Sequence, residues 1–277
     1  ENAQRLIEQD NVAALFMSRA TPHTQAILPL LAKYNIALVA PSTGAMVFHQ
    51  PVNPLVFNVR SSYQAETEKA VEHLHTLGLN RIAMVHVDDS FGEDCLAGAM
   101  KGFKQTKLEP VTVIKADRSK PDYAAIVPQL IKENAQAVIW IGSSVAVSDG
   151  VKALRKAGSA MQVVTVSNNA SSGFAKQLGE AVRGVIVTQV FPNERSMGYA
   201  INREAAALVK ADGGVTISPS VMEGFASAKV LVEGLRRAGP KPTREKVVAA
   251  LSGMNHFDLG GLEVGYGPSD RTGLSFV

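Results

Sequence analysis

Hydroxyl-bearing residues follow two apolar segments near the start of this sequence. Ser18-Arg-Ala-Thr21 comes directly after the segment 12–17, and Ser42-Thr-Gly44 follows the segment 36–40. Backbone N–H groups at a helix start, together with nearby hydroxyls, can bind a small anion such as a carboxylate. A helix is predicted to follow Thr21, which would be its N-cap, with Pro22 in the first turn. The other interpretation is structural: Thr21 only caps this helix, and Ser42 and Thr43 only form a turn.

The apolar segment 82–87 ends abruptly at two aspartates, Asp88 and Asp89. A helix start is predicted next, because Ser90 and Glu93 have the spacing of a capping box. An unbroken apolar strand is typical of a parallel sheet that helices cover on both faces. Ligands of such sheets bind beyond the carboxyl ends of the strands. The polar residues that follow two later apolar segments are therefore further candidates: Ser143, Ser144, Ser167 and Asn168.

The elements that must position these residues alternate along most of the chain. Strands are predicted at 12–17, 36–40, 55–59, 81–87, 111–115, 137–141, 162–166 and 185–190. Helices are predicted at 2–9, 22–34, 65–77, 91–105, 124–133, 147–157 and 174–178, and then at 199–211, 218–238 and 243–251. The tail, 257–277, is rich in glycine and has short apolar pieces that indicate hairpin strands. Alternating strands and helices indicate an α/β fold with parallel sheets and right-handed crossovers.

The predicted sheets differ in completeness. The strands between residues 81 and 190 form one full doubly wound unit, whereas the strands before residue 60 form only part of a second. A stable sheet usually has more than two or three parallel strands, and this sequence opens on a helix that would normally follow a strand. We therefore expect that an N-terminal β-α-β segment is missing from the sequence.

Length and charge limit the class of protein. A chain of 277 residues suits two lobes of ~100–150 residues each. The formal charge of +3 and the absence of a dense Lys/Arg cluster argue against nucleic acid as a partner. No apolar stretch reaches the ~20 residues that span a bilayer, and no signal peptide is visible, because Glu1 opens inside a helical pattern. The single cysteine, Cys95, is expected to be a small core residue.

Signals for a metal, a cofactor or an enzyme are absent or weak. His73 and His75 are two positions apart on a predicted helix and so point to different faces. Asp88 and Asp89 have no third or fourth ligand nearby in the sequence, which favours strand-end capping. No dinucleotide-binding, phosphate-binding or nucleophile-elbow motif is present. We therefore expect no cofactor and no catalysis, although scattered catalytic groups would escape such a search.

Several segments, in this order and spacing, resemble the leucine/isoleucine/valine-binding type of solute-binding protein, the type I periplasmic receptors of ABC transporters. These segments are Ile36-Ala-Leu-Val-Ala-Pro-Ser-Thr-Gly44, Val56-Phe-Asn-Val-Arg60, Arg81-Ile-Ala-Met-Val85, Asp89-Ser-Phe-Gly92, Gly184-Val-Ile-Val-Thr-Gln-Val190, Val221-Met-Glu-Gly-Phe-Ala-Ser-Ala228 and Asp258-Leu-Gly-Gly261. Each segment is weak alone, but together they cover nearly all of the chain.

The resemblance implies two Rossmann-like lobes with parallel sheets and a ligand in the cleft between them. Lobe one would hold residues 1–61 and 192–253, and lobe two would hold 62–191 and 254–277. The crossovers would lie near Arg60-Ser-Ser62, Phe191-Pro-Asn193 and Met254. The first two are polar or proline-bearing breaks in the pattern, and closure about such hinges is the expected motion.

The resemblance also implies a function: an extracytoplasmic solute receptor that binds a small carboxylate and delivers it to the membrane permease of an ABC transporter. Such a receptor is periplasmic or tethered as a lipoprotein, and its signal peptide is removed. In the family, the loops at 18–21 and 42–44 hold the carboxylate of an amino acid ligand. The residues expected there are Arg19, Ala20, Thr21, Ser42, Thr43 and Gly44. Arg19 would form a bidentate ion pair with a carboxylate, or would be a solvated loop residue.

Phe91 matches a family aromatic that covers the apolar part of the ligand; its other interpretation is a side chain tucked under a helix start. One departure from the family concerns the ligand's ammonium, which an acidic residue near the later loop usually holds. Here that loop is Val166-Ser-Asn-Asn-Ala-Ser-Ser172, with no carboxylate. A buried ammonium without a charged partner is costly. The departure favours an aromatic or keto acid, unless Asp88 or Asp89 substitutes for the missing acid.

Three alternatives remain at this point. A ligand-sensing regulatory or receptor domain of the same fold would share every feature above, and only the complete gene separates it from a transport receptor. A sugar is a less favoured ligand, because aromatic residues make up only 6% of the chain. The ligand itself stays open between a branched-chain or other amino acid and an aromatic or keto acid.

Glu223, inside a predicted helix, is expected to face solvent or to cap a loop of lobe one.

Overall fold

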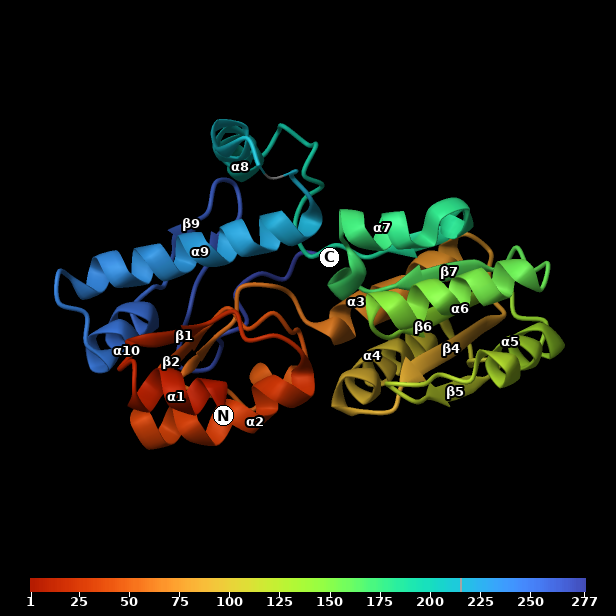
Figure 1. Ribbon diagram of the computed structural model, residues 1–277, viewed down its shortest axis with the longest axis horizontal. Helices are drawn as coiled ribbons and strands as arrows, with labels where there is room; N and C mark the ends of the chain where they lie inside the picture. The colour runs from red at the N-terminus through yellow and green to blue at the C-terminus, as the bar shows by residue number, and fades with distance from the viewer. Residues whose placement is uncertain (215) are drawn as a thin grey trace. The chain divides into compact units, whose positions relative to one another are not determined.

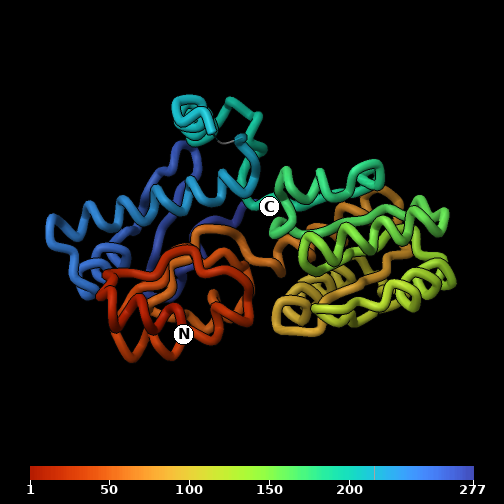
Figure 2. The backbone as a smooth tube through the Cα atoms, in the orientation of Figure 1, coloured from red at the N-terminus to blue at the C-terminus, as the bar shows by residue number. Residues whose placement is uncertain are grey.

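The computed structural model describes residues 1–214 and 216–277 and divides into two compact units (Figure 1). The first unit holds residues 1–62 and 190–276, and the second holds 63–189 with Val277. The path of the chain in Figure 2 leaves the first unit after its opening segment and returns to it later. Each unit is therefore described on its own.

The second unit is built on a five-stranded parallel sheet with the order β5-β4-β6-β7-β8. Its strands are β4 (Ile82–Val87), β5 (Val113–Ala116), β6 (Ala137–Ile141), β7 (Gln162–Thr165) and β8 (Val185–Val187). Every residue of β4 and β6 is buried, which confirms the prediction of strands covered on both faces. The strand order reverses between β4 and β6, so the carboxyl ends of these strands form the switch point of a doubly wound sheet.

Helices cover both faces of this sheet. They are α3 (Tyr63–Thr76), α4 (Ser90–Thr106), α5 (Tyr123–Lys132), α6 (Ser144–Lys156) and α7 (Ser172–Leu178), with the short 3-10 helices η2 (Ser167–Asn169) and η3 (Gly179–Val182). One core cluster joins α5, α6 and α7 to alternate residues of β4 and β6, among them Val85 and Trp140. Side chains alternate along a strand, so the remaining residues of β4 and β6 face α3 and α4, which pack closely against each other.

Close packing in the second unit depends on small residues. A Cβ atom on Gly98 of α4 would lie 2.3 Å from Thr67 Oγ1 and 2.4 Å from the Cα atom of Gln64, both on α3. A Cβ atom on Gly150 of α6 would lie 2.3 Å from the ring of Trp140. Cys95 is completely buried on α4, as its composition-based interpretation predicted. These glycines let the helices approach the sheet and one another closely.

The first unit has a smaller sheet with the parallel order β1-β2-β3. Its strands are β1 (Ala14–Phe16), β2 (Ala37–Val39) and β3 (Val56–Phe57). Its helices are α1 (Asn2–Glu8), α2 (Thr21–Tyr34), α8 (Ala200–Asp212), α9 (Pro219–Ala238) and α10 (Arg244–Ser252), with the 3-10 helix η1 (Met46–Phe48). The predicted parallel α/β fold is therefore confirmed in both units.

The glycine-rich tail contains the predicted hairpin, β9 (Phe257–Asp258) paired antiparallel with β10 (Glu263–Val264). It belongs to the first unit up to Phe276, whereas the sequence placed 254–277 in lobe two. The reason is that the tail runs along the segment after β3. The Tyr266 hydroxyl donates to the Asn58 carbonyl at 2.8 Å, and the Leu274 N–H donates to the Val59 carbonyl at 2.9 Å.

Two predicted helix starts differ in detail from the structure. Asp89, not Ser90, caps α4, and its carboxylate accepts from the N–H groups of Phe91 and Gly92, so the predicted Ser90–Glu93 capping box does not form. The N-cap of α2 is Ala20, not Thr21. The described helices include none that is both long and apolar enough to cross a membrane.

Candidate functional site

The loops after β1 and β2 are joined side by side in the first unit. The Ser42 N–H donates to the Ser18 carbonyl at 2.8 Å, and Arg19 and Ser42 form an isolated parallel bridge. The hydroxyls of Thr21 and Thr43 lie 2.8 Å apart, and both residues are buried. The structure thus brings together the two loops that the sequence predicted to act together, and it pairs their threonines.

The start of α2 lies in one of these loops and has an unusual backbone. Ala20, at the N-cap, has φ +68°, and Met17 and Ala40, at the ends of β1 and β2, have φ of +51° and +48°. Such conformations cost energy for residues other than glycine, and they gather at binding sites. In the described part of the chain no side chain caps α2, so its first N–H groups and its dipole are not neutralised by a capping oxygen.

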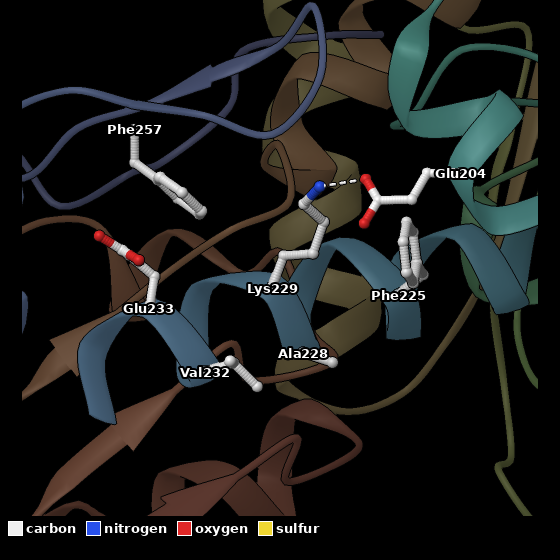
Figure 3. Close-up of a pocket in the computed structure, with 7 residues that line it drawn as sticks. All are labelled: Glu204, Phe225, Ala228, Lys229, Val232, Glu233 and Phe257. Carbon is white, nitrogen blue, oxygen red and sulfur yellow. Dashed lines mark hydrogen bonds and ion pairs between the residues drawn. The ribbon is translucent and has the colours of Figure 1, made fainter. Parts of the chain in front are cut away.

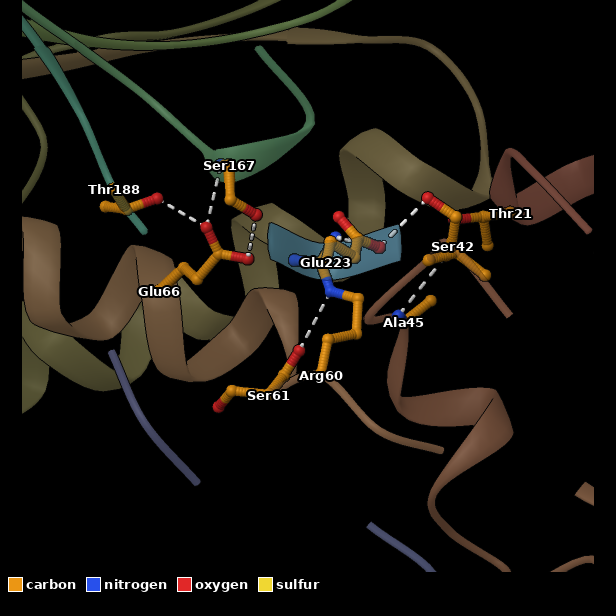
Figure 4. Close-up of polar contacts among 10 residues, drawn as sticks. Thr21, Ser42, Ala45, Arg60, Ser61, Glu66, Ser167, Thr188 and Glu223 are labelled. Carbon is orange, nitrogen blue, oxygen red and sulfur yellow. Dashed lines mark hydrogen bonds and ion pairs between the residues drawn. The ribbon is translucent and has the colours of Figure 1, made fainter. Parts of the chain in front are cut away.

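A charged pair supports the second loop from behind. The Ser42 hydroxyl donates to Glu223 Oε1 of α9 at 3.0 Å, and Arg60 Nη1 lies 3.9 Å from the same oxygen (Figure 4). Arg60 also donates from Nε to the Ser61 carbonyl at 3.2 Å, and its side chain is only 3% exposed. Of the two interpretations of Glu223, the structure bears out the one in which it binds a loop of the first unit.

The remaining predicted residues of this site have simpler environments. Gly44 is buried, and Ala20 is partly exposed. Arg19 is exposed, which fits both of its interpretations, a carboxylate partner or a solvated loop residue. The structure therefore leaves the role of Arg19 a prediction.

The strand ends of the second unit are more fully occupied by internal contacts. Besides capping α4, Asp89 pairs with Arg118, and Asp88 lies 3.4 Å from Lys115 Nζ. Phe91 is 6% exposed and packs on Tyr63, with 4.8 Å between the ring centroids. This contact is the one expected if Phe91 is tucked under a helix start.

The loops after β6 and β7 are bound to each other. Ser143 caps α6 by accepting from the Ala146 N–H, and Ser144 donates to Asn169 Oδ1 at 3.0 Å. Asn168 Nδ2 donates to the Gly142 carbonyl at 3.1 Å. The structure therefore brings Ser143, Ser144 and Asn168 close together, and each has a structural partner within the second unit.

Glu66 of α3 is a residue that the sequence analysis missed. Its side chain is completely buried and accepts from the Ser167 N–H at 2.8 Å, from the Ser167 hydroxyl at 2.9 Å and from the Thr188 hydroxyl (Figure 4). The loop after β7 does have a carboxylate beside it, although the loop's own sequence has none. Glu66 lies 101 positions before Ser167, so no local pattern could have revealed the contact.

Two cavities can be compared with the predicted site residues, and only the smaller one is lined by such a residue, Ser143. One of about 300 Å³ in the first unit is lined by Phe225, Lys229 and Val232 of α9, Phe257 of β9 and neighbouring residues, and Lys229 pairs there with Glu204 (Figure 3). It includes no predicted site residue. The other, at the ends of β4, β5 and β6, has only about 10 Å³, which is room for about one water molecule. Among residues 1–214 and 216–277, no three His, Cys, Asp or Glu side chains gather in a way that could hold a metal ion.

Parallel sheets covered by helices, with polar loops at the strand ends, define an α/β protein of the class that binds small molecules beyond its strands. The chain belongs to the periplasmic binding protein family, whose model matches residues 1–275. Its fold is that of the type I periplasmic binding proteins. Members bind small molecules outside the cytoplasm and are generally not enzymes.

Solved structures agree with this assignment. A substrate-binding periplasmic protein from Ralstonia solanacearum has 30% sequence identity and a TM-score of 0.89, over 99% of this chain and 78% of that one. A possible leucine/isoleucine/valine-binding protein from Rhodopirellula baltica has 24% identity and a TM-score of 0.88, over 99% and 76%. A branched-chain amino acid ABC transporter protein from Thermus thermophilus with bound valine has 19% identity and a TM-score of 0.84, over 99% and 75%. No curated protein matches this sequence.

Proposed function

We propose that this protein is an extracytoplasmic solute receptor that binds a small carboxylate and passes it to the permease of an ABC transporter. The observation that carries the proposal is the start of α2, where strained Ala20 and an uncapped helix lie beside the Thr21–Thr43 hydroxyl pair. A helix N-terminus attracts an anion through its N–H groups and its dipole. Family membership makes a bound solute the natural source of that anion.

The ligand contacts that we propose come first from the first unit: Ala20, Thr21, Ser42, Thr43 and Gly44, with Arg19 at the rim. Contributions from Phe91, Ser143, Ser144, Ser167 and Asn168 of the second unit stay predictions. We expect binding without chemical conversion. The valine in the Thermus structure and the name of the Rhodopirellula protein support an amino acid or a related acid as the ligand.

Calorimetric titration tests the carboxylate. Leucine, phenylalanine, benzoate and phenylpyruvate form the first panel, and the amide of the tightest binder is then compared with its free acid. We expect the amide to bind at least ~30-fold more weakly, because it loses a charge-assisted contact with the helix start. Thr43→Val should weaken the acid ~10-fold, whereas Thr76→Val, on the exposed end of α3 in the second unit, should leave affinity unchanged. Equal binding of amide and acid would contradict the proposal.

The role in transport has its own test in the complete gene. A signal or lipoprotein leader, encoded beside transporter genes, supports a transport receptor that is periplasmic or membrane-tethered. A helix-turn-helix segment in the same reading frame would instead identify a ligand-sensing regulator of the same fold, and would contradict the transport role while leaving the binding site intact.

A further inference from the structure

The Ser42 hydroxyl has only one proton, and in the structure that proton is donated to a carboxylate. Ser42 donates it to Glu223 Oε1 at 3.0 Å. A serine hydroxyl carries one donor and two acceptor lone pairs, and an ionised carboxylate can only accept. While Ser42 donates this hydrogen bond to Glu223, its hydroxyl can offer a ligand only lone pairs.

Glu223 is well placed to keep that orientation. Its side chain is 12% exposed, and the buried Arg60 lies 3.9 Å from the accepting oxygen. The attraction between the guanidinium and the carboxylate helps to hold Glu223 in reach of Ser42. All three residues belong to the first unit, so the arrangement does not depend on the second.

The neighbouring threonines behave differently. The hydroxyls of Thr21 and Thr43 lie 2.8 Å apart, and either can be the donor. A pair that shares one hydrogen bond still has a second proton to donate. The site therefore presents unlike groups: donors at the threonine pair and the start of α2, which suit a carboxylate, and an acceptor at Ser42, which does not.

We propose that Glu223 is a positioning residue that sets ligand specificity through Ser42. The favoured ligand then carries a hydrogen-bond donor, either a hydroxyl or an ammonium, close to its carboxylate. The matching keto acid has only an acceptor there and leaves the Ser42 lone pairs unsatisfied. The proposal rests on the proposed function, because it concerns the same carboxylate site.

One carbon skeleton with three substituents tests this directly. Wild-type protein is titrated calorimetrically with leucine, 2-hydroxy-4-methylpentanoate and 4-methyl-2-oxopentanoate, and with phenylalanine, phenyllactate and phenylpyruvate. In the better-bound series, we expect a donor-bearing acid to bind at least ~10-fold more tightly than its keto acid. The reason is that the keto acid cannot donate a hydrogen bond to Ser42. The amino and hydroxy acids then identify whether an ammonium or a hydroxyl is the donor.

Variants separate positioning from simple support of the fold. Glu223→Gln replaces a carboxylate by an amide, whose NH2 group can donate to Ser42. The Ser42 hydroxyl can then donate its own proton to the ligand, so the preference for a donor-bearing acid over the keto acid should fall to ~3-fold or less. Ser42→Ala should have the same effect and serves if Glu223→Gln does not fold. Glu233→Gln, another glutamate on α9 that pairs with Arg236 and Arg237 instead, should keep the full preference. Mere damage to the fold would weaken all three ligands equally.

The outcomes distinguish the two proposals. If none of the six acids binds to the wild-type protein, the proposed function fails and this inference fails with it. If an acid binds but its keto analogue binds equally well, or if Glu223→Gln keeps the wild-type preference, only the role of Glu223 is overturned.

Discussion

Both units of this protein have a glutamate on a helix that accepts from the serine of a strand-end loop, but the two arrangements differ in closure. In the second unit Glu66 is completely buried and accepts from the N–H and hydroxyl of Ser167 and from Thr188. In the first unit Glu223 stays partly exposed and accepts from Ser42 beside Arg60. A fully enclosed hydrogen-bond network holds a fold in one arrangement. The partly open one leaves groups available to a ligand.

The sheets repeat this contrast. The second unit has five parallel strands, with β4 and β6 buried on both faces. The first has three short parallel strands, and its core also uses the tail, including Tyr266 and Leu274. Strained backbone at Met17, Ala20 and Ala40 lies at the strand ends of the first unit. We infer that the first unit contributes more to binding specificity and the second more to rigidity.

The largest expected effect comes from removing the enclosed carboxylate. Glu66→Ala leaves buried N–H and hydroxyl donors without an acceptor and should cost about 4 kcal/mol in the free energy of unfolding. Trp140 is the one tryptophan in the sequence and is buried in the second unit, so its fluorescence during urea denaturation reports this loss. Glu72→Ala, on the exposed side of the same helix, should change stability by less than about 0.5 kcal/mol. Similar stability of both variants would contradict the contrast.

Next in size is the packing of α3 against α4. Gly98→Ala should cost about 3 kcal/mol, because the new Cβ would press on the Gln64 backbone at 2.4 Å. Gly234→Ala in the first unit should cost only about 1 kcal/mol, because it meets the flexible end of Leu251 at 2.7 Å. Denaturation of each variant, followed by circular dichroism, measures the difference. Gly224→Ala, with open space around it, is the control and should be neutral or slightly stabilising; a smaller loss at Gly98 than at Gly234 would refute this interpretation.

A third effect should depend on pH and arise in the first unit. Burial, helped by the charge of Arg60, lowers the pKa of His49 to about 4 from 6.5. The unfolded chain therefore binds a proton that the folded chain rejects, and stability present above pH 6.5 is lost as the pH falls toward 4, by about 3 kcal/mol. His49→Gln should flatten this part of the curve of urea midpoint against pH. His73→Gln, exposed on α3, should leave it unchanged, and an unaltered curve in His49→Gln would rule the mechanism out.

The smallest effect should be the loss of the threonine pair. Thr43→Val keeps the size of the side chain but removes its hydroxyl, so Thr21 loses its buried partner at 2.8 Å. The expected cost is about 1 kcal/mol in the free energy of unfolding. Circular dichroism during urea denaturation measures this change in the free energy of unfolding, with Thr106→Val of α4 as a control in the second unit. A larger loss than that of Glu66→Ala would mean that the first unit, not the second, carries the tighter polar network.

The element order could be predicted from the sequence because long apolar segments and turn residues are local signals. The segments 82–87 and 137–141 became the buried strands β4 and β6, and the predicted hairpin formed in the tail. The choice of cap was less predictable. Asp89 and Ser90 are both good capping residues, and only the geometry of the turn selects Asp89.

The partners within the site could not be predicted, because they join residues far apart in the chain. Ser42 and Glu223 are 181 positions apart, and Ser167 and Glu66 are 101 positions apart. Helical spacing says which residues share a face, but it does not say which loop that face meets. The same limit explains the tail, whose contacts with Asn58 and Val59 placed it in the first unit and not the second.

Cys95, enclosed on α4 and the one thiol in the sequence, gives the second unit a built-in chemical clock. A thiol reagent can reach it only when that unit opens, so the labelling rate counts such openings in solvent without denaturant. A ligand whose binding slows this opening would be detected as slower labelling of Cys95, without an engineered probe.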